Sequence, residues 1–345
     1  MKYAELVSLE NLFSAWEAFK KGKTKKADVM EFERHLEDNI FALQDDLVNR
    51  RYAHGPYHQF HIFDPKFRLI HKAEVRDRVL HHLLFRYLEQ LYKPSFIYQS
   101  YSSQKERGTH RAVVDVAAAL RAGSRNNHRT VWALKLDIKK FFDSIHHETL
   151  TALLTRRVRD ENVLWLIGQV IDSYSSTQGE GRGVPIGNLT SQIFANIYLS
   201  QLDYFVKFQL RMKHYFRYAD DFIILNEDSA YLKLLLELIQ SFLDKKLLLT
   251  IHPQKIVLKK FHQGIDFVGS VIFPHHRVLR TKTKQRMFRK ARQMVERYNA
   301  GVIDEFTLQQ STQSYLGLLQ HCDGYDVQQM LQNDVWKHKQ CAISE

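Results

Sequence analysis

Two short runs of β-forming residues, His214–Tyr218 and Phe222–Leu225, flank Ala219, Asp220 and Asp221. Two such runs joined by so short a polar link predict a β-hairpin, which places both carboxylates at its tip. A third carboxylate, Asp137, lies near the end of the apolar run 130–138, which is typical of a buried strand. Because neighbouring strands of a sheet lie about 4.8 Å apart, the three acids can meet at one end of the sheet.

Helical patterns surround these segments. Apolar residues recur at helical spacing over 74–91, 112–122, 148–158, 190–202 and 230–244. Further helices are expected in the first 63 residues and beyond residue 277, a strand pair over 57–70 with its turn at Asp64 and Pro65, and a strand over 247–251. The order strand, helix, hairpin, helix, strand predicts an α+β fold in which helices cover one face of an antiparallel sheet.

Composition narrows the class of protein. The 345 residues are 44% hydrophobic and contain no apolar run near the roughly 18 residues that cross a bilayer, so no membrane contact is expected. Glutamates interrupt the first apolar pattern and only two cysteines are present, which favours a cytoplasmic location. The 50 Lys and Arg against 38 Asp and Glu give a net charge of +12, which favours nucleic acid as a partner over an ordinary basic surface.

The predicted cluster of carboxylates has a specific chemical use. Like charges at short range are costly unless a cation neutralises them, and oxygen ligands suit Mg²⁺. Two such ions would hold the attacking and leaving oxygens of a phosphoryl transfer. Taken singly, the acids have a simpler interpretation, in which Asp220 and Asp221 form a turn and Asp137 caps a helix.

An ordered set of motifs resembles the reverse transcriptases. Asp137-Ile-Lys-Lys-Phe-Phe-Asp-Ser-Ile145 is similar to their first palm motif and Tyr218-Ala-Asp-Asp221 to their hairpin motif, and the resemblance extends from Lys66 to His321. It implies a right-hand polymerase with fingers, palm and a helical thumb. The expected boundaries are a helical N-terminal extension over 1–63, fingers and palm over 64–273, and the thumb over 274–345.

The resemblance also implies an RNA-directed DNA polymerase that uses two Mg²⁺ ions, for which Mn²⁺ can substitute. Asp137 and Asp220 would hold both ions and Asp221 would support the ion on the primer side. Lys255 would protonate the leaving pyrophosphate, although a solvated lysine is the alternative. The incoming deoxynucleoside triphosphate would contact residues that match the family's nucleotide site, namely Lys66, Arg68, Ile138, Phe142, Ile186 and Gly187.

For two of these residues, Arg68 and Phe142, the resemblance implies a role with a clear physical reason. Arg68 would grip the triphosphate, a bidentate task that suits arginine better than lysine. Phe142 would lie under the sugar and exclude a 2′-hydroxyl, with a core position beside Phe141 as the alternative, because adjacent side chains on an extended segment face opposite ways.

The C-terminal part is expected to hold the RNA template and its DNA or RNA primer. Phe267-Val-Gly-Ser270 resembles the primer grip, where Gly269 allows close backbone approach. Eight Lys or Arg and no acid lie over 277–292, and a helix so basic binds a sugar-phosphate backbone without reading its sequence. Arg280, Lys284 and Arg286 are the expected contacts, and a charged solvated helix is the alternative.

One segment indicates a subtype. Gly183-Val-Pro-Ile-Gly-Asn-Leu-Thr-Ser-Gln192 has Ile186 where most reverse transcriptases have glutamine, and it resembles the enzymes of diversity-generating retroelements. That resemblance implies copying of a template-repeat RNA with errors at adenines, for targeted gene diversification by mutagenic retrohoming. It also implies an accessory variability determinant, a basic helical pentamer. The alternatives are a retron-type or phage-defence reverse transcriptase and a non-catalytic RNA-binding protein on the same scaffold.

Overall fold

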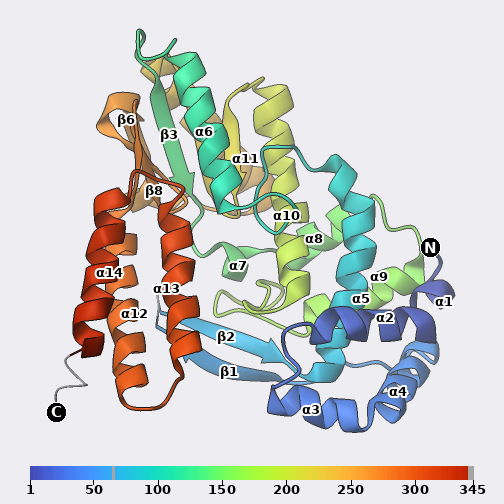
Figure 1. Ribbon diagram of the computed structural model, residues 1–345. Coiled ribbons are helices and arrows are strands. Elements are labelled where there is room, and N and C mark those ends of the chain that lie inside the picture. The colour runs from blue at the N-terminus through green and yellow to red at the C-terminus, as the bar shows by residue number, and fades with distance from the viewer. Residues whose placement is uncertain (64–66, 341–345) are drawn as a thin grey trace. The chain divides into compact units, whose positions relative to one another are not determined.

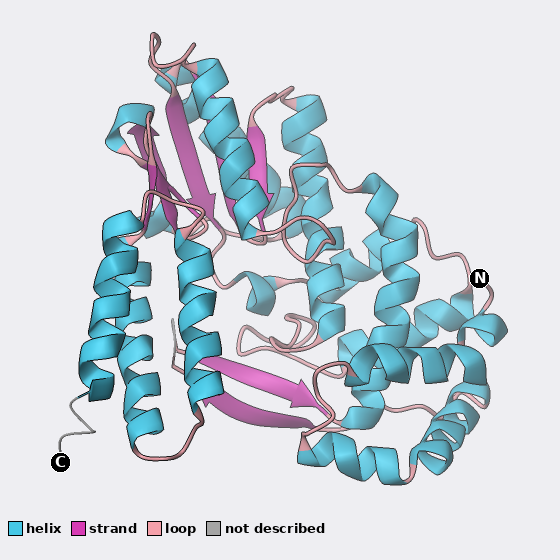
Figure 2. Cartoon of the chain, in the orientation of Figure 1, coloured by secondary structure: helices cyan, strands magenta, loops and turns pink. Residues whose placement is uncertain are grey.

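The computed structural model describes residues 1–63 and 67–340 (Figures 1 and 2). Lys66, an expected nucleotide contact, lies outside the described residues. The chain forms two compact units. Unit 1 comprises 1–103, 136–222 and 234–256, and unit 2 comprises 104–135, 223–233 and 257–345. Both units are therefore assembled from segments far apart in the sequence, and the boundaries expected for an extension, fingers with palm, and a thumb stay a prediction.

Unit 1 begins with four helices, α1 (Tyr3–Leu6), α2 (Leu9–Lys20), α3 (Ala27–Arg34) and α4 (Leu36–Val48). Helix α2 starts where the Ser8 hydroxyl accepts a hydrogen bond from the Asn11 amide, and it buries Trp16 and Phe19. Its apolar face packs against the long helix α5 (Val75–Tyr92) and against α4 (Figure 1). The expected N-terminal helices are thus present and share one apolar core with α5.

The rest of unit 1 surrounds one buried helix. Strands β1 (Tyr57–Ile62) and β2 (Arg68–Ala73) pair antiparallel, which confirms the expected strand pair. Helix α10 (Leu189–Tyr204) packs against α5 and against α8 (His147–Leu154). It buries residues on every side, because neighbours surround it. The remaining elements are η1 (Lys93–Ser95), α7 (Phe141–Ser144), α9 (Glu161–Asp172), η2 (Phe205–Gln209), β4 (Tyr215–Tyr218) and η3 (Pro253–Lys255).

A four-stranded sheet carries the predicted acids. Its strand order is β4, β5 (Asp221–Asn226), β3 (Trp132–Asp137) and β6 (Val257–Lys260). Strands β3 and β6 are antiparallel, with Trp132 opposite Lys260. Asp137 is the last residue of β3 and Asp221 the first of β5, while Asp220 lies in the turn between β4 and β5. Mixed helices and an antiparallel sheet confirm the expected α+β class.

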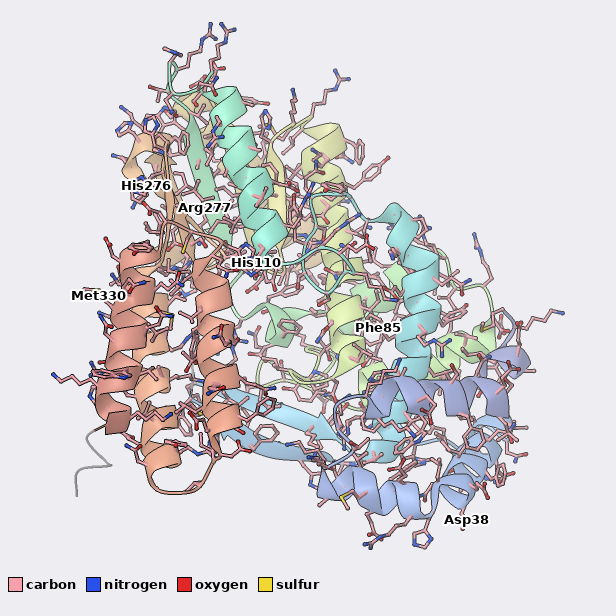
Figure 3. All side chains as sticks on the ribbon, viewed as in Figure 1. Asp38, Phe85, His110, His276, Arg277 and Met330 are labelled. Carbon is pink, nitrogen blue, oxygen red and sulfur yellow. The ribbon has the colours of Figure 1, made fainter. Side chains whose placement is uncertain are left out.

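Unit 2 contains α6 (Thr109–Gly123), a small sheet and three helices. The sheet consists of β7 (Ile265–Phe267), β8 (Ser270–Ile272) and β9 (Arg277–Leu279), preceded by η4 (Phe261–Gln263). Arg277 begins β9 directly after His276 (Figure 3). Helix α12 (Thr281–Asn299) packs against α13 (Glu305–Leu319) and α14 (Tyr325–Gln340). Their shared core consists of Met287, Ala291, Leu316, Leu319 and Leu331, so the C-terminal segment is helical as expected.

One expected element is wrong. The strand expected over 247–251 does not form, because helix α11 (Ser229–Leu247) continues to the start of that segment. Leu248 then has φ +52°, which an extended strand cannot accommodate. The Leu249 amide donates back to the Leu243 carbonyl over 3.0 Å and closes the helix end. Only Ile251 forms a bridge, with Ile138.

Among the helices in the described part of the chain, none is long and apolar enough to cross a bilayer.

Candidate active site

The end of β3 is held in place by backbone hydrogen bonds on both sides of Asp137. The His252 amide donates to the Asp137 carbonyl over 2.8 Å, and the Lys139 amide donates to the Thr250 carbonyl over 2.8 Å. The Ile138 amide donates to the Asp220 carbonyl over 3.3 Å. This last bond joins the two acidic segments directly, so the structure brings Asp137 and Asp220 together from 83 residues apart in sequence (220 − 137).

The proximity of Asp137 affects the pKa of the Asp220 carboxyl. Burial raises the pKa of the Asp220 carboxyl above its ordinary value, and the negative charge of Asp137 raises it further. The positive charges of Lys255 and Arg68 act in the opposite direction. The net result is a carboxylate whose ionised form is disfavoured in the folded protein.

Lys255 lies beside the first acid. Its Nζ is 2.5 Å from Asp137 Oδ1, and its side chain is 37% exposed. The lysine extends from η3, where Pro253 starts a single helical turn after His252. The ammonium is therefore paired with Asp137 and remains accessible to solvent.

The donor set fits a divalent cation. Asp137 and Asp220 are close enough for one charge to disfavour the other, and both supply the carboxylate oxygens that Mg²⁺ prefers. Asp221 follows directly at the start of β5. In the described residues no group of three His, Cys, Asp or Glu side chains is already gathered as a metal cluster. Asp137 and Asp220 are thus the two members of the predicted metal site whose carboxylates lie within electrostatic reach of each other.

A cavity of about 310 Å³ opens next to the Asp220 turn, by which we mean residues Tyr218–Asp221. We call it the Ile186 cavity. Four of the six predicted nucleotide contacts line it, whereas the Ile138 side chain is only 1% exposed and does not. The lining residues are Arg68, Ser102, Ser103, Phe142, Ile186, Gly187, Asn188, Ser191, Gln192, Ala195, Asn196, Leu199, Arg217, Tyr218 and Ala219.

The loop that carries Ile186 is bonded to strand β2. The His71 amide donates to the Ile186 carbonyl over 3.0 Å, and Asn188 Nδ2 donates to the His71 carbonyl over 2.7 Å. Gly187 has φ +116°, and a Cβ there would lie 2.7 Å from Ile70 Cγ2. Only glycine therefore allows this close approach. The backbone bonds determine where the Ile186 side chain enters the cavity.

The two adjacent phenylalanines have different environments. Phe141 is 2% exposed and belongs to the core. Phe142 is half-buried and lines the Ile186 cavity. Lys140 just before them has φ +46° at the start of α7, which sets the direction in which this short helix leaves β3. Of the two rings, only that of Phe142 lines the cavity.

Several lining residues were not expected from the sequence. Ser102 and Ser103 come from the polar stretch before α6, and Arg217 precedes the Asp220 turn. A signal for Arg217 existed, because a charged residue in the middle of an apolar strand pattern indicates a buried pairing. No comparable signal marks the two serines.

The residues expected to bind primer and template all lie in unit 2. Phe267 is fully buried, whereas Gly269 has φ +87° in the β7–β8 turn. The Arg280 guanidinium donates to Asp266, so part of its charge is neutralised within the unit. Lys284 and Arg286 are half-buried on α12.

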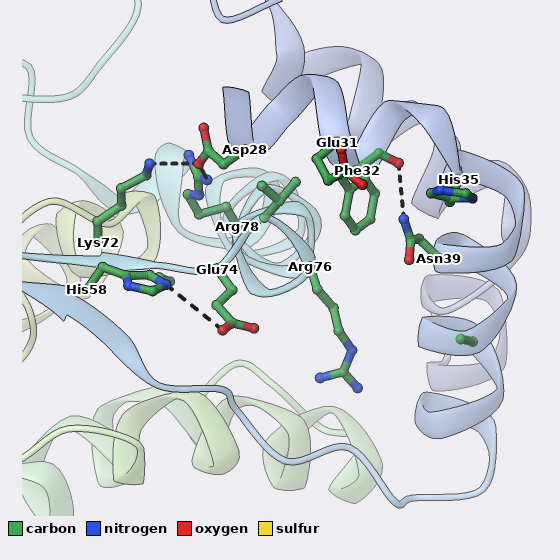
Figure 4. Close-up of a pocket in the computed structure, with 13 residues that line it drawn as sticks. Asp28, Glu31, Phe32, His35, Asn39, His58, Lys72, Glu74, Arg76 and Arg78 are labelled. Carbon is green, nitrogen blue, oxygen red and sulfur yellow. Dashed lines mark hydrogen bonds and ion pairs between the residues drawn. The ribbon is translucent and has the colours of Figure 1, made fainter. Parts of the chain in front are cut away.

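Another cavity, of about 720 Å³, lies in unit 1 near the N-terminal helices (Figure 4). Several of its charged groups form ion pairs with one another. Lys72 Nζ is 2.6 Å from Asp28 Oδ2, Arg78 also contacts Asp28, and His58 Nε2 is 4.0 Å from Glu74 Oε1. None of the predicted site residues lines it. The two pairs of Asp28 join α3 to β2 and α5, which is a structural role.

Solved structures with a similar fold include telomerases. The telomerase from Candida albicans in complex with a TWJ fragment of telomeric RNA has a TM-score of 0.51 and 14% identity, over 84% of this chain and 55% of that chain. The apo telomerase from Candida tropicalis has a TM-score of 0.50 and 14% identity, over 88% of this chain and 62% of that one. At such low identity the likeness establishes the fold alone.

Relatives by sequence include a bacterial protein, YkfC, and proteins encoded in introns. Protein YkfC of Escherichia coli (strain K12) is 24% identical over 280 residues, 70% of this chain and 71% of YkfC. Group II intron-encoded protein LtrA of Lactococcus lactis subsp. cremoris is 28% identical over 187 residues, 51% of this chain and 29% of LtrA.

An uncharacterized 91 kDa protein in the cob intron of Schizosaccharomyces pombe is 34% identical over 136 residues, 38% of this chain and 16% of that protein. This chain thus spans well under half of the length of the intron proteins that it matches. A family model described as reverse transcriptase (RNA-dependent DNA polymerase) matches residues 63–318. Because that match covers more than half of the chain and includes the Asp137 and Asp220 segments, the chain belongs to the reverse transcriptase family.

Proposed function

We propose that this protein is an RNA-directed DNA polymerase whose catalytic centre consists of Asp137, Asp220 and Asp221. The observation that supports this most directly is the Ile186 cavity, which adjoins the Asp220 turn and is lined by both Arg68 and Phe142. The positive charge of Arg68 also acts on Asp220, so the arginine lies within electrostatic reach of the acids. A cavity with a cation, an aromatic ring and nearby carboxylates suits a nucleoside triphosphate.

Each side chain then has a task. Arg68 binds the triphosphate oxygens, and Phe142 packs under the sugar and leaves no room for a 2′-hydroxyl. Lys255, whose Nζ is 2.5 Å from Asp137 Oδ1, can donate a proton to the leaving pyrophosphate. When bound by the aspartates, Mg²⁺ supplies the positive charge that in-line phosphoryl transfer needs on its attacking and leaving oxygens.

Primer extension on an RNA template tests the proposal. We expect Mg²⁺-dependent incorporation of deoxynucleotides that falls to background in Asp220→Asn, while template binding, measured by fluorescence anisotropy, is retained. Glu227→Gln is a matched control, because this exposed acid follows the same hairpin at a distance from the turn. If the unaltered protein binds RNA but does not extend a primer, the non-catalytic alternative holds.

Sugar selection gives an independent test of the nucleotide pocket. Phe142→Ala should raise incorporation of ribonucleotides relative to deoxynucleotides by about ten-fold or more, since the ring no longer occupies the space of a 2′-hydroxyl. Phe141→Leu is the control, because that neighbouring ring lies in the core. Equal sugar discrimination in the Phe142→Ala variant and the parent protein would contradict the proposed role.

We further propose that the enzyme belongs to the diversity-generating class and copies a template-repeat RNA with errors at adenines. The support is Ile186, whose backbone is bonded to β2 and whose side chain lines the cavity. Isoleucine fills volume without forming directional hydrogen bonds. The free-energy difference between a correct and a mispaired base is therefore smaller beside isoleucine than it would be beside a glutamine.

Error spectra test the role of Ile186. Ile186→Gln should lower misincorporation opposite template adenines, while Ile186→Val, which stays apolar, should leave the spectrum unchanged. Sequencing of extension products measures both. An unchanged adenine error rate in Ile186→Gln would contradict this finer proposal and leave the polymerase proposal standing.

The genetic setting separates the remaining alternatives. A pair of near-identical DNA repeats beside the gene supports the diversity-generating class, whereas an adjoining catalytic intron RNA would place the protein with relatives such as the group II intron-encoded LtrA. The basic pentameric accessory protein is part of the finer proposal. Co-purification with and without ribonuclease tests whether that partner binds the protein itself or only shared RNA.

A further inference from the structure

Arg217 is a fully buried cation on β4, two residues before the centre of the Asp220 turn. Its side chain is 0% exposed, and its partner Asp203 on α10 is 1% exposed. Removing two charges from water is costly, and a buried ion pair by itself is weak evidence of stabilisation. An arginine in this position therefore calls for a role beyond stability.

Every guanidinium N–H has an acceptor. Nε and Nη2 each donate to a different carboxylate oxygen of Asp203 over 2.6 Å. Nη2 also donates to Ser100 Oγ over 2.9 Å, and Nη1 donates to Asn196 Oδ1 over 3.5 Å. The fifth bond runs from Nη1 to the Ala219 carbonyl over 3.1 Å. The planar fork thus has one fixed orientation, which a lysine cannot reproduce.

The fifth bond reaches the residue that determines the shape of the turn. Ala219 has φ +53°, a left-handed conformation that a residue with a Cβ adopts only when its surroundings impose it. Asp220 and Asp221 follow directly. A carbonyl held from the core side fixes the peptide that leads into both acids.

The same arginine is connected to the wall of the Ile186 cavity. Its backbone amide donates to the Gln99 carbonyl, and the Tyr101 amide donates to the Arg217 carbonyl, both over 2.9 Å. The neighbouring Ser102 lines the cavity, and its carbonyl accepts from Asn196 Nδ2 over 3.0 Å. One buried side chain therefore joins the Asp220 turn, helix α10 and the segment that carries Ser102.

We propose that Arg217 is a positioning residue that sets the geometry of the Asp220 turn for cation binding. It also fixes the position of the segment around Ser102, which lines the nucleotide cavity, relative to that turn. The proposal rests on the proposed function. Through the Ala219 carbonyl, a fully buried arginine would then control the affinity of the acids for a divalent ion.

The test compares Arg217→Lys with Tyr215→Phe. The Tyr215 hydroxyl donates to Asp203 Oδ1, the oxygen that also accepts from Arg217 Nε, over 2.8 Å, and it has no bond to Ala219. Its loss therefore weakens the buried ion pair without changing a contact to the turn. Binding of Mn²⁺ alone, measured by electron paramagnetic resonance on the folded protein, is the first readout. The kcat and KM for deoxynucleotide are the second, and the thermal midpoint reports stability.

In Arg217→Lys we expect Mn²⁺ affinity to fall about ten-fold or more, with a fall in kcat of similar size and a smaller change in KM, as for other residues that orient metal ligands. In Tyr215→Phe the thermal midpoint should fall while Mn²⁺ affinity stays within about two-fold. Adding Ala219→Gly to Arg217→Lys should restore part of the Mn²⁺ affinity, because glycine adopts φ > 0 without strain.

Two results would overturn the proposal. One is a loss of Mn²⁺ affinity that follows the loss of thermal midpoint in the same way in Arg217→Lys and in Tyr215→Phe. A merely structural role would produce that result. The other is unchanged Mn²⁺ affinity in folded Arg217→Lys. If that variant does not fold, Ser100→Ala decides. It removes one acceptor of Nη2, and we expect a fall in Mn²⁺ affinity of about three-fold at nearly constant thermal midpoint; an unchanged affinity counts against the role.

The Mn²⁺ readout needs neither template nor turnover. A protein without polymerase activity would contradict the proposed function, while the Mn²⁺ comparison would still decide whether Arg217 positions the turn.

Discussion

Two groups of charged side chains flank the Asp220 turn, and they differ in how completely their charges are compensated. Asp203 and Arg217 are fully buried, and each guanidinium N–H has an acceptor. Asp137 and Asp220 are only partly buried, with one ammonium, that of Lys255, in contact with Asp137 and a raised pKa on Asp220. The compensated group, Asp203 and Arg217, fixes the scaffold. The uncompensated group, Asp137 and Asp220 with Lys255, is left with excess negative charge, which is the condition for binding a cation.

The largest expected effect comes from removing the uncompensated charge. Asp220→Asn should abolish primer extension and yet raise the thermal midpoint at pH 7, because an ionised side chain that the fold disfavours is replaced by a neutral one. Primer extension and differential scanning calorimetry measure the two. A lower thermal midpoint at pH 7 would show that Asp220 stabilises the fold.

The gain in stability should depend on pH. Because the pKa of Asp220 is raised in the folded state, folding takes up protons between the ordinary value of 3.8 and the raised value. The cost of the charge is therefore absent below 3.8 and complete above the raised pKa. The difference in thermal midpoint between Asp220→Asn and the parent protein should shrink as the pH is lowered. A difference that grows on acidification would contradict this sign.

Removing one partner of the compensated group should have the next largest effect. Asp203→Asn leaves the buried Arg217 charge without its counter-ion, and we expect a loss of about 3–5 kcal/mol in the free energy of unfolding. Urea denaturation measures it, and Tyr215→Phe, which loses one hydrogen bond, should cost only about 1 kcal/mol. A loss below about 1 kcal/mol in Asp203→Asn would mean that water or another group compensates the arginine.

Replacing Lys255, the lysine of the uncompensated group, should affect activity much more than stability. Lys255→Gln should slow nucleotide incorporation by about 100-fold, the range of a general acid. It should change stability by less than about 1 kcal/mol, because the Lys255 side chain is more than one-third exposed and solvent screens its pair with Asp137. Rapid-quench kinetics and urea denaturation check the two numbers. An unchanged incorporation rate would assign Lys255 to the solvated surface.

Sequence patterns were most reliable where a signal is local. The hairpin around Asp220, the strand ending at Asp137 and the pair β1 and β2 all follow from periodicity and turn residues within a few positions. The strand expected over 247–251 failed for a related reason. Apolar residues there suit either a helix end or a strand, and the left-handed Leu248 that decides between them leaves no mark on the pattern.

The amino-acid sequence is enough to select the candidate acids, because the order and spacing of the Asp137 and Asp220 segments are properties of the chain. That Phe142 rather than Phe141 lines the cavity, and that Arg217 donates to the Ala219 carbonyl, is seen only in the folded protein. Two partners of Arg217, Asp203 and Ser100, lie 14 and 117 residues away in the sequence. Burial and directional bonding between such distant residues arise only when the fold brings them together, which local patterns do not encode.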